Sequence, residues 1–336
     1  MSQRWPGGLI KPTPITPTGP YQDGSASGVW TLDQMQYWLK QGLWPIAGNT
    51  LQRGVFALNS SMNQINIATT GNSTSFGTLS PSRQSLAGCA SSTRGLFVGG
   101  GTYGVSYYNN IDYITIASAG NSTDFGDLTL SRTFASSCNS STRGLIGSGT
   151  TGTNTNVIDY VTIASTGNAT DFGDVTQARY ALAACSSSTR GVFGGGYDPT
   201  GVNTIDYVTI ASAGNATDFG DLTVSRGQIS SCSSSTRGLF GGGYLTSTQN
   251  VIDYVTIASA GNATDFGDLT VGRYGLAACS SSTRGVFGAG GNNSVGAQNV
   301  MDYVTIASTG NATDFGDYAD ASENFAACSN SNGGTQ

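Results

Sequence analysis

The sequence contains no histidine, and only one glutamate and two lysines occur among its 336 residues. Without histidine, neither a Ser-His-Asp triad nor a Cys-His nucleophile can be assembled. A glycan-cleaving enzyme would instead need a carboxylate cluster unique to one repeated unit. Within the units described below, before the irregular final linker that holds Glu323, only Asp198 stands outside the pattern. The sequence therefore predicts that the chain is not an enzyme and carries no cofactor.

Charged residues are also scarce, at 10% of the chain, and the net charge is −6. Nucleic acids and anionic membranes are bound through clustered lysine and arginine, so both partners are disfavoured. No stretch approaches the roughly 20 apolar residues needed to cross a bilayer, and no apolar signal segment follows the N-terminal Met1-Ser-Gln-Arg-Trp-Pro6. We expect a protein without membrane insertion that is made and assembled in a cytoplasm.

Glycine is abundant instead, and most of the chain repeats one unit about every 47 residues, most clearly at residues 179–221. A period of this length is typical of propeller blades and solenoid units. Arg-Gly recurs at Arg53, Arg94, Arg143, Arg190, Arg237 and Arg284, and a cysteine recurs at Cys89, Cys138, Cys185, Cys232, Cys279 and Cys328. These copies predict one repeat domain over residues 51–336, preceded by a distinct segment over residues 1–50.

Each unit divides into four short apolar runs, which in the clearest copy are residues 180–185, 191–196, 205–210 and 221–225. Short runs rich in β-branched residues, without helical periodicity, are typical of strands covered on both faces. Four strands per unit predict an all-β, six-bladed β-propeller.

The ends of the array are complementary. The first unit starts at its second strand, near Arg53, and the last unit is followed by an additional first strand that ends at Cys328. We therefore expect residues 325–329 to complete the first blade beside residues 53–58, which would remove both exposed edges. The first unit also has Asn63-Gln64 in place of Asp-Tyr.

The repeated polar residues admit two interpretations. The six cysteines occupy equivalent positions, too far apart around a ring to pair, so we expect free, buried thiols rather than disulfides or a ring of metal ligands. The repeated aspartates, such as Asp171, Asp174 and the Asp of each Asp-Tyr, are compatible with metal sites or paired carboxylates. Because they recur in nearly every unit, we expect them to accept turn N–H groups or to pair with arginines, and we expect no metal site.

The segment over residues 1–50 holds all four tryptophans, Trp5, Trp30, Trp38 and Trp44, and five of the eight prolines. The prolines predict an extended arm, and a capping-box-like Thr31-Leu-Asp-Gln34 predicts one short helix over residues 32–41. So short and aromatic a segment needs a surface to pack on, either its own repeat domain or another chain. It is therefore predicted to act as an anchor or an oligomerisation segment.

In each typical unit an Arg precedes one strand, Gly-Gly follows that strand, and a strand such as Ile-Asp-Tyr-Val-Thr-Ile comes next. This order resembles the kelch repeat over residues 51–330. The kelch tryptophan of the fourth strand is absent here, with Phe-Gly nearby. The repeated Asp-Tyr-Val-Thr-Ile-Ala-Ser and Gly-Asn-Ala-Thr-Asp-Phe-Gly-Asp segments are similar to those of kelch-like virion proteins of tailed bacteriophages, especially phages of cyanobacteria. That resemblance implies a tail fibre, spike or other virion surface protein, present in several copies and bound to other virion proteins through residues 1–50.

Most units have another repeated arginine besides that of Arg-Gly, here called the second arginine; it is Arg179 in the clearest copy. Variation among the units is concentrated in the loop between the second and third strands and just after this second arginine. Both regions emerge at the same end of a four-stranded blade. The residues chosen as candidate binding residues are Tyr103, Tyr107, Tyr108, Asn109, Tyr197, Asp198, Tyr244, Asn292 and Asn293. Loops of Tyr, Asn, Ser and Gly suit adaptable recognition of a host-cell glycan or protein. Two alternatives stay open: drift of the loops without selection for binding, and a decoration or connector role within the particle.

Overall fold

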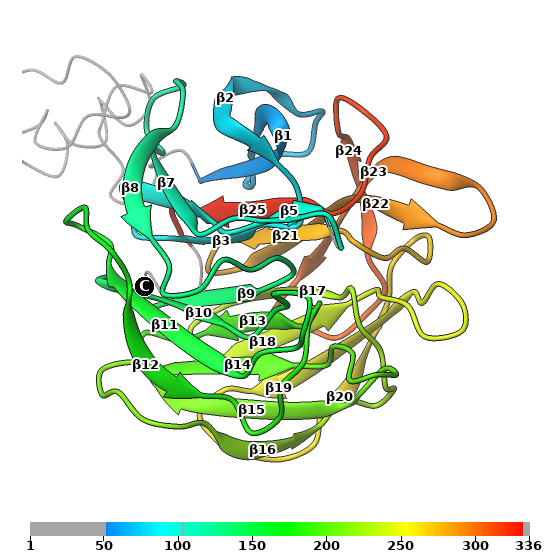
Figure 1. Cartoon of the computed structure of the whole chain (residues 1–336). Coiled ribbons are helices and arrows are strands. Elements are labelled where there is room, and N and C mark those ends of the chain that lie inside the picture. Colours follow the sequence, from blue (N-terminus) through cyan, green and yellow to red (C-terminus); the bar gives the residue numbers. More distant parts are fainter. Residues whose placement is uncertain (1–51, 103, 332–336) are drawn as a thin grey trace, which may run out of the picture. The chain divides into compact units, whose positions relative to one another are not determined.

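The computed structural model describes residues 52–102 and 104–331, and this part of the chain contains strands and turns but no helix. Its strands form six blades arranged as a β-propeller (Figure 1). The all-β, six-bladed prediction is therefore confirmed. The predicted arm, its helix and its four tryptophans lie outside the described residues. No helix long and apolar enough to span a membrane was found in the part that is described.

The blades contain the following strands, given from the centre outward. Blade 1 consists of β25 (Ala326–Ser329), β1 (Arg53–Asn66) and β2 (Thr74–Arg83). Blade 2 consists of β3 (Ala87–Ala90), β4 (Arg94–Val98), β7 (Asn110–Thr115) and β8 (Thr123–Asp127). Blade 3 consists of β9 (Ser136–Asn139), β10 (Arg143–Gly147), β11 (Val157–Thr162) and β12 (Thr170–Asp174).

The remaining blades repeat the same order. Blade 4 consists of β13 (Ala183–Ser186), β14 (Arg190–Gly194), β15 (Thr204–Thr209) and β16 (Thr217–Asp221). Blade 5 consists of β17 (Ser230–Ser233), β18 (Arg237–Gly241), β19 (Val251–Thr256) and β20 (Thr264–Asp268). Blade 6 consists of β21 (Ala277–Ser280), β22 (Arg284–Asn292), β23 (Gly296–Thr305) and β24 (Thr313–Asp317). A small hairpin of β5 (Gly101–Thr102) and β6 (Ser106–Tyr107) lies in a loop of blade 2.

The apolar core lies between neighbouring blades rather than at one central point. Phe219 of blade 4, for example, belongs to the same buried cluster as Phe240 and Val255 of blade 5. Because each blade is covered on both faces, its second strand is buried almost throughout, as in Arg190–Gly194. This explains why the strands are continuous short apolar runs in the sequence rather than alternating ones.

The position of the fourth strand corrects the sequence-based assignment. The predicted run, residues 221–225, forms a bend after Asp221, and the strand is the preceding Thr217–Asp221. Asp206 of β15 lies opposite Asp218, with a register shift beside it. Phe219 O also accepts a hydrogen bond from Gly261 N of the next blade, at 2.7 Å. Hydrogen bonds on both sides therefore impose an extended conformation on a sequence that resembles a turn.

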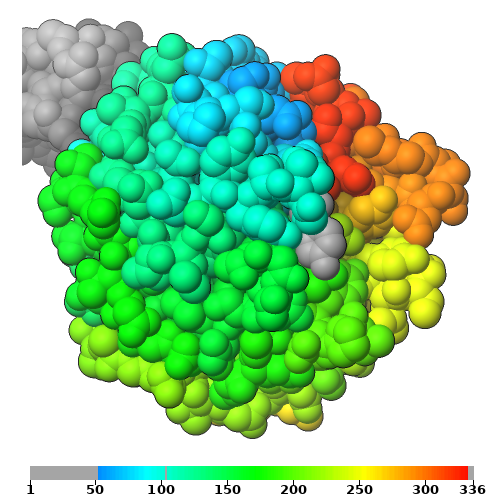
Figure 2. All heavy atoms as spheres, in the orientation of Figure 1, coloured from blue at the N-terminus to red at the C-terminus, as the bar shows by residue number. Residues whose placement is uncertain are grey.

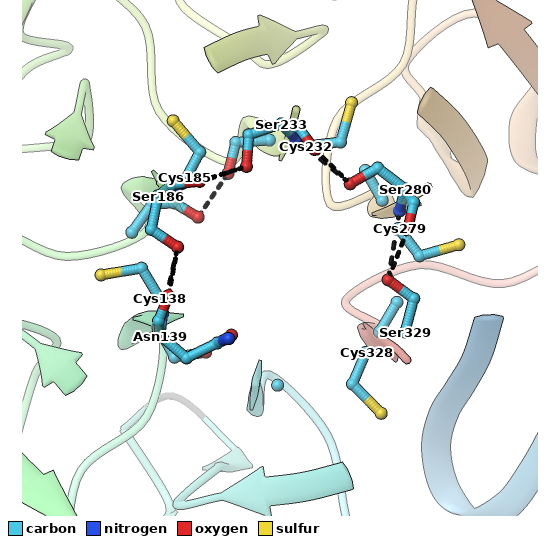
Figure 3. A pocket seen from close by; sticks show the side chains of 16 residues that line it. Cys138, Asn139, Cys185, Ser186, Cys232, Ser233, Cys279, Ser280, Cys328 and Ser329 are labelled. Atoms are coloured by element: carbon cyan, nitrogen blue, oxygen red, sulfur yellow. Dashed lines mark hydrogen bonds between the residues drawn. The ribbon is translucent and has the colours of Figure 1, made fainter. Parts of the chain in front are cut away.

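The six cysteines are free and buried, as predicted. Figure 3 shows the sulfur atoms of Cys138, Cys185, Cys232, Cys279 and Cys328 pointing away from the central opening, toward the neighbouring blades. There, each sulfur lies against the glycine of the next unit's Arg-Gly, so close that an added Cβ would come within 2.4–2.9 Å of it. The pairs are Cys89–Gly144, Cys138–Gly191, Cys185–Gly238, Cys232–Gly285, Cys279–Gly54 and Cys328–Gly95. Burial raises the pKa of the Cys89 thiol to about 12, so these cysteines are packing groups rather than nucleophiles.

The turn before each fourth strand fastens its blade to the preceding one. Its asparagine Oδ1 accepts a hydrogen bond from a backbone N–H of the neighbouring fourth strand, at 3.0–3.1 Å. The asparagines are Asn72, Asn121, Asn168, Asn215, Asn262 and Asn311. The outer strands are thus paired on their free sides, which protects edges that would otherwise be open to aggregation.

The arginine of each Arg-Gly makes a second link between blades. In five units its guanidinium stacks on the tyrosine of Asp-Tyr, 4.3–4.5 Å from the ring centroid. Its Nη1 donates to an isoleucine carbonyl of the next blade at 2.6–3.1 Å. The pairs are Arg53–Ile116, Arg94–Ile163, Arg143–Ile210, Arg190–Ile257, Arg237–Ile306 and Arg284–Ile67.

Blade 1 is assembled from both ends of the repeat array. Strand β25 pairs antiparallel with β1, with Gly54 opposite Ser329 and Ala57 opposite Ala326. Figure 2 shows the blades following one another in sequence order, with blade 6 (orange to red) beside blade 1 (blue). Blade 6 contacts blade 1 through Arg284 and Ile67, and also through Cys279 and Gly54.

Candidate functional site

The repeated aspartates of Asp-Tyr form buried ion pairs, not an acid cluster. Each carboxylate lies beside the second arginine of its unit, and the side chains of both partners are 0–5% exposed. The pairs are Arg83–Asp112, Arg132–Asp159, Arg179–Asp206, Arg226–Asp253 and Arg273–Asp302. Within residues 52–102 and 104–331, no group of three or more His, Cys, Asp or Glu side chains is placed to hold a metal ion. The repeated carboxylates therefore serve the scaffold.

The sixth ion pair is replaced by a neutral contact at the junction of blades 6 and 1. Asn63 stands in place of the aspartate and Ser322 in place of the arginine. The Asn63 amide Nδ2 instead donates to the hydroxyl of Tyr318 at 2.8 Å, and both side chains are buried. Burial raises the pKa of Tyr318 to about 12, so the hydroxyl stays neutral at this junction.

The channel along the propeller axis is narrow. One section is lined by Ser137, Asn139 and Ser186 with their equivalents in the other blades, and its cavity measures about 50 Å³. A further cavity of about 100 Å³, lined in part by Ser137 and Leu182, continues it toward the variable end of the blades. In Figure 3 the serine hydroxyls link neighbouring inner strands; Ser186 Oγ, for example, donates to Asn139 O at 2.7 Å. The serine-lined section holds a few water molecules.

The two variable regions of each unit meet at one end of the propeller, here called the variable face. It consists of the loops between second and third strands and the linkers from each fourth strand to the next first strand. Isolated bridges join the two, between Tyr180 and Tyr197 and between Gly227 and Tyr244. The opposite end carries the nearly identical Ser-Ser-Ser-Thr and Gly-Asn-Ala-Thr turns and is called the uniform face.

The candidate residues of blade 2 lie in its loop beside blade 3. The Tyr107 hydroxyl accepts a hydrogen bond from Gly104 N at 3.1 Å and lies next to Gly152 of the blade 3 loop. Tyr108 and Asn109 are half-buried, and their carbonyls accept backbone hydrogen bonds from the following linker. Tyr103 lies outside the described residues.

Tyr197, Asp198 and Tyr244 come together over blades 4 and 5. The Tyr197 hydroxyl donates to Tyr244 O at 2.8 Å, and burial raises the pKa of Tyr197. Asp198 accepts hydrogen bonds from Asn154 at 3.2 Å and from Gln177 at 3.0 Å, which ties the blade 3 and blade 4 loops together.

The two candidates in blade 6 lie on its long β22–β23 hairpin, apart from the tyrosines of blades 4 and 5. Asn292 donates to Gly272 O at 2.7 Å and accepts from Ser294 N at 2.8 Å, so its amide shapes the hairpin turn. Asn293 beside it is exposed. Figure 2 shows the hairpin (orange) projecting from the surface.

The structure adds residues that the candidate set from the sequence omits. Phe134 packs edge-on against Tyr180 at a centroid distance of 6.1 Å, and Tyr180 lies 5.5 Å from Tyr197. Tyr244 packs in the same way on Tyr274 at 5.7 Å. These five rings form what we call the aromatic arc, across blades 3 to 6. In the sequence, these positions are marked only by their variability among the units, which does not show that the rings touch.

Among the residues that the structure describes, the variable face offers no free cation. The described residues contain no lysine and eleven arginines. Five arginines belong to the buried ion pairs, and the other six stack on aromatic rings while bonding to isoleucine carbonyls. Two acids lie near the arc: Asp198 follows Tyr197 in the chain, and Glu323 lies beside Tyr274. The pKa of Tyr274 is raised by burial and by the hydrogen-bonded Glu323 carboxylate.

Comparison with models of known protein families and with curated proteins found no match to this chain. Function is therefore inferred from the geometry described above.

Proposed function

We propose that this chain is a surface protein of a bacteriophage particle, such as a tail fibre or spike protein, and that its variable face attaches the particle to the host cell. One observation carries the proposal: the residues that differ among otherwise near-identical units come together on a single face. Loop residues bridged to one another, such as Tyr180 and Tyr197, form a continuous surface there. On the uniform face the same turns serve only to join the blades.

The finer description of the fold belongs to this proposal. The propeller is kelch-like, and β25 closes it by completing blade 1 beside β1. The pairing of Gly54 with Ser329 and the contact of Arg284 with Ile67 support closure at this position. Residues 1–50 anchor the protein to other virion proteins, and several copies are present in the particle. The scaffold carries no catalytic group, metal or cofactor.

Attachment is tested by the binding of the full-length protein to intact candidate host cells. We expect saturable binding by the natural chain and at least tenfold weaker binding by the triple variant Tyr197→Ser, Tyr244→Ser, Tyr274→Ser, because these rings supply rigid contact area at the face. Retained thermal unfolding temperature would show that the variant is folded.

The matched control changes three exposed alanines of the uniform face, Ala119→Glu, Ala213→Glu and Ala260→Glu. This variant should bind cells like the natural chain. A folded natural protein that binds no cell, yet assembles into particles, would overturn the attachment proposal in favour of an architectural role.

A further inference from the structure

At the centre of the variable face, six residues form a ring of backbone hydrogen bonds around the propeller axis. Each linker contributes one residue, whose N–H donates to the carbonyl of the equivalent residue in the preceding linker at 2.6–3.0 Å. The six are Ser85, Phe134, Ala181, Gln228, Gly275 and Asn324, and we call this ring the axial mouth. Because every backbone N–H of the mouth donates within the ring, any donor that the mouth offers to a ligand must come from its side chains.

All six residues of the axial mouth have left-handed backbone conformations, with φ between 51° and 66°. Glycine adopts this conformation without strain, whereas other residues pay roughly 1–2 kcal/mol. Only Gly275 is a glycine, and the other five positions carry five different side chains. Strain that is retained at five of six equivalent positions indicates that these side chains are kept for a purpose at the mouth.

The mouth opens on a cavity of about 70 Å³, with apolar walls that include Leu182, Ile229 and Phe325. Asn324 Oδ1, a buried acceptor among the lining residues, has no hydrogen-bond partner. A buried unsatisfied acceptor costs about 1–3 kcal/mol, which a donor from a ligand would recover. The volume admits a group of a few atoms that carries an O–H or N–H.

The aromatic arc begins at the mouth, since Phe134 belongs to both. From there the rings continue through Tyr180 and Tyr197 to Tyr244 and Tyr274. These half-buried rings suit the packing of the apolar C–H faces of a sugar, which alternate with its hydroxyl groups. The large exposed aliphatic side chains among the described residues are four scattered ones, Val105, Leu130, Leu245 and Val295, which do not form the apolar centre of a protein interface.

Charge restricts the ligand further. With all described arginines engaged in the scaffold, and Asp198 and Glu323 near the arc, an anionic ligand would meet like charge and no partner. We propose, building on the attachment function, that the axial mouth and the aromatic arc bind an uncharged glycan. One hydroxyl- or amide-bearing substituent enters the mouth and donates to Asn324 Oδ1, and the sugar rings pack along the arc.

The test uses glycine substitutions that remove a mouth side chain while relaxing its backbone. The full-length Phe134→Gly and Asn324→Gly variants should keep or raise the thermal unfolding temperature. Asn59→Gly is the matched control, because Asn59 also has a left-handed φ of 54° but lies outside the mouth and the arc. The probes are arrayed neutral, N-acetylated, sialylated, sulfated and uronic-acid oligosaccharides, with cell binding measured in parallel.

We expect binding of neutral or N-acetylated oligosaccharides, weakened at least tenfold in Phe134→Gly and Asn324→Gly and unchanged in Asn59→Gly. Binding of anionic oligosaccharides alone, or equal binding by all variants, would overturn the inference. Cell binding that is lost on protease treatment of the cells, without any glycan binding, would overturn the glycan assignment and leave attachment standing. Absence of both cell and glycan binding by the folded protein would overturn both.

Discussion

Replacing Arg273 with methionine is expected to lower the free energy of unfolding by about 3–5 kcal/mol, because it leaves the Asp302 carboxylate buried without its cation. Both side chains of this ion pair are fully buried. Thr270 donates to Asp302 from its hydroxyl and from its backbone N–H, but two neutral donors do not replace a guanidinium. Urea unfolding of the natural and variant proteins at pH 7 measures the loss.

The same variant should also invert the usual dependence on pH. Burial already raises the pKa of Asp302 above its ordinary value of 3.8, while Arg273 opposes that rise. Without Arg273 the folded-state pKa rises further, so the folded variant binds a proton that the unfolded chain releases. Stability is then greatest below the unfolded pKa and falls as the pH rises through the folded one. We therefore expect the stability that Arg273→Met loses, measured against the natural chain at the same pH, to be smaller near pH 4 than at pH 7.

Two controls separate charge from packing. Arg237→Met removes a half-buried arginine that stacks on Tyr254 and bonds to Ile306 O, and should cost about 1–2 kcal/mol. The double variant Arg273→Met, Asp302→Leu removes both charges and should recover most of the loss. A single Arg273→Met variant as stable as the natural chain would contradict the assignment of a scaffold role to the ion pair.

Ending the chain after Asn324 is expected to abolish the folded monomer. This truncation removes β25, and with it four pairings to β1 and the contact of Cys328 with Gly95. It also removes buried Phe325, whose burial alone contributes about 1.5–3 kcal/mol. The inner edges of blades 1, 2 and 6 would then be exposed, so we expect aggregation and no cooperative unfolding transition by circular dichroism.

A chain ending after Ser331 is the matched control, since it keeps every strand of the propeller. It should unfold at the same temperature as the full chain. If the chain ending after Asn324 is monomeric and equally stable, β25 does not close the ring and the proposed closure is wrong.

The sequence predicts the strands of the scaffold well where apolar residues decide the structure. In the clearest copy the first three strands are predicted at residues 180–185, 191–196 and 205–210, and they lie at Ala183–Ser186, Arg190–Gly194 and Thr204–Thr209. The fourth strand was misplaced because Thr217–Asp221 contains two aspartates and a glycine, which have low β-propensity. Its conformation depends on hydrogen bonds to the next blade, such as that from Gly261 to Phe219, which no local pattern reveals.

The candidate site was located only coarsely for a similar reason. Variation among the units identified the loops, and Tyr197 and Tyr244 do lie together. The sequence does not predict the axial mouth, because nothing in residues such as Ala181 and Gln228 indicates a left-handed φ. Only the closed ring of backbone hydrogen bonds brings six linkers together at one point.

Hydrogen–deuterium exchange of the full-length protein, with and without host-cell envelope fragments, tests the central claim most directly. If the variable face attaches to the cell, exchange should slow in the linkers around Phe134, Tyr180, Gln228 and Tyr274. It should be unchanged in the Ser-Ser-Ser-Thr turns of the uniform face. Slowed exchange confined to the uniform face, or no change at envelope concentrations that saturate binding, would contradict the account.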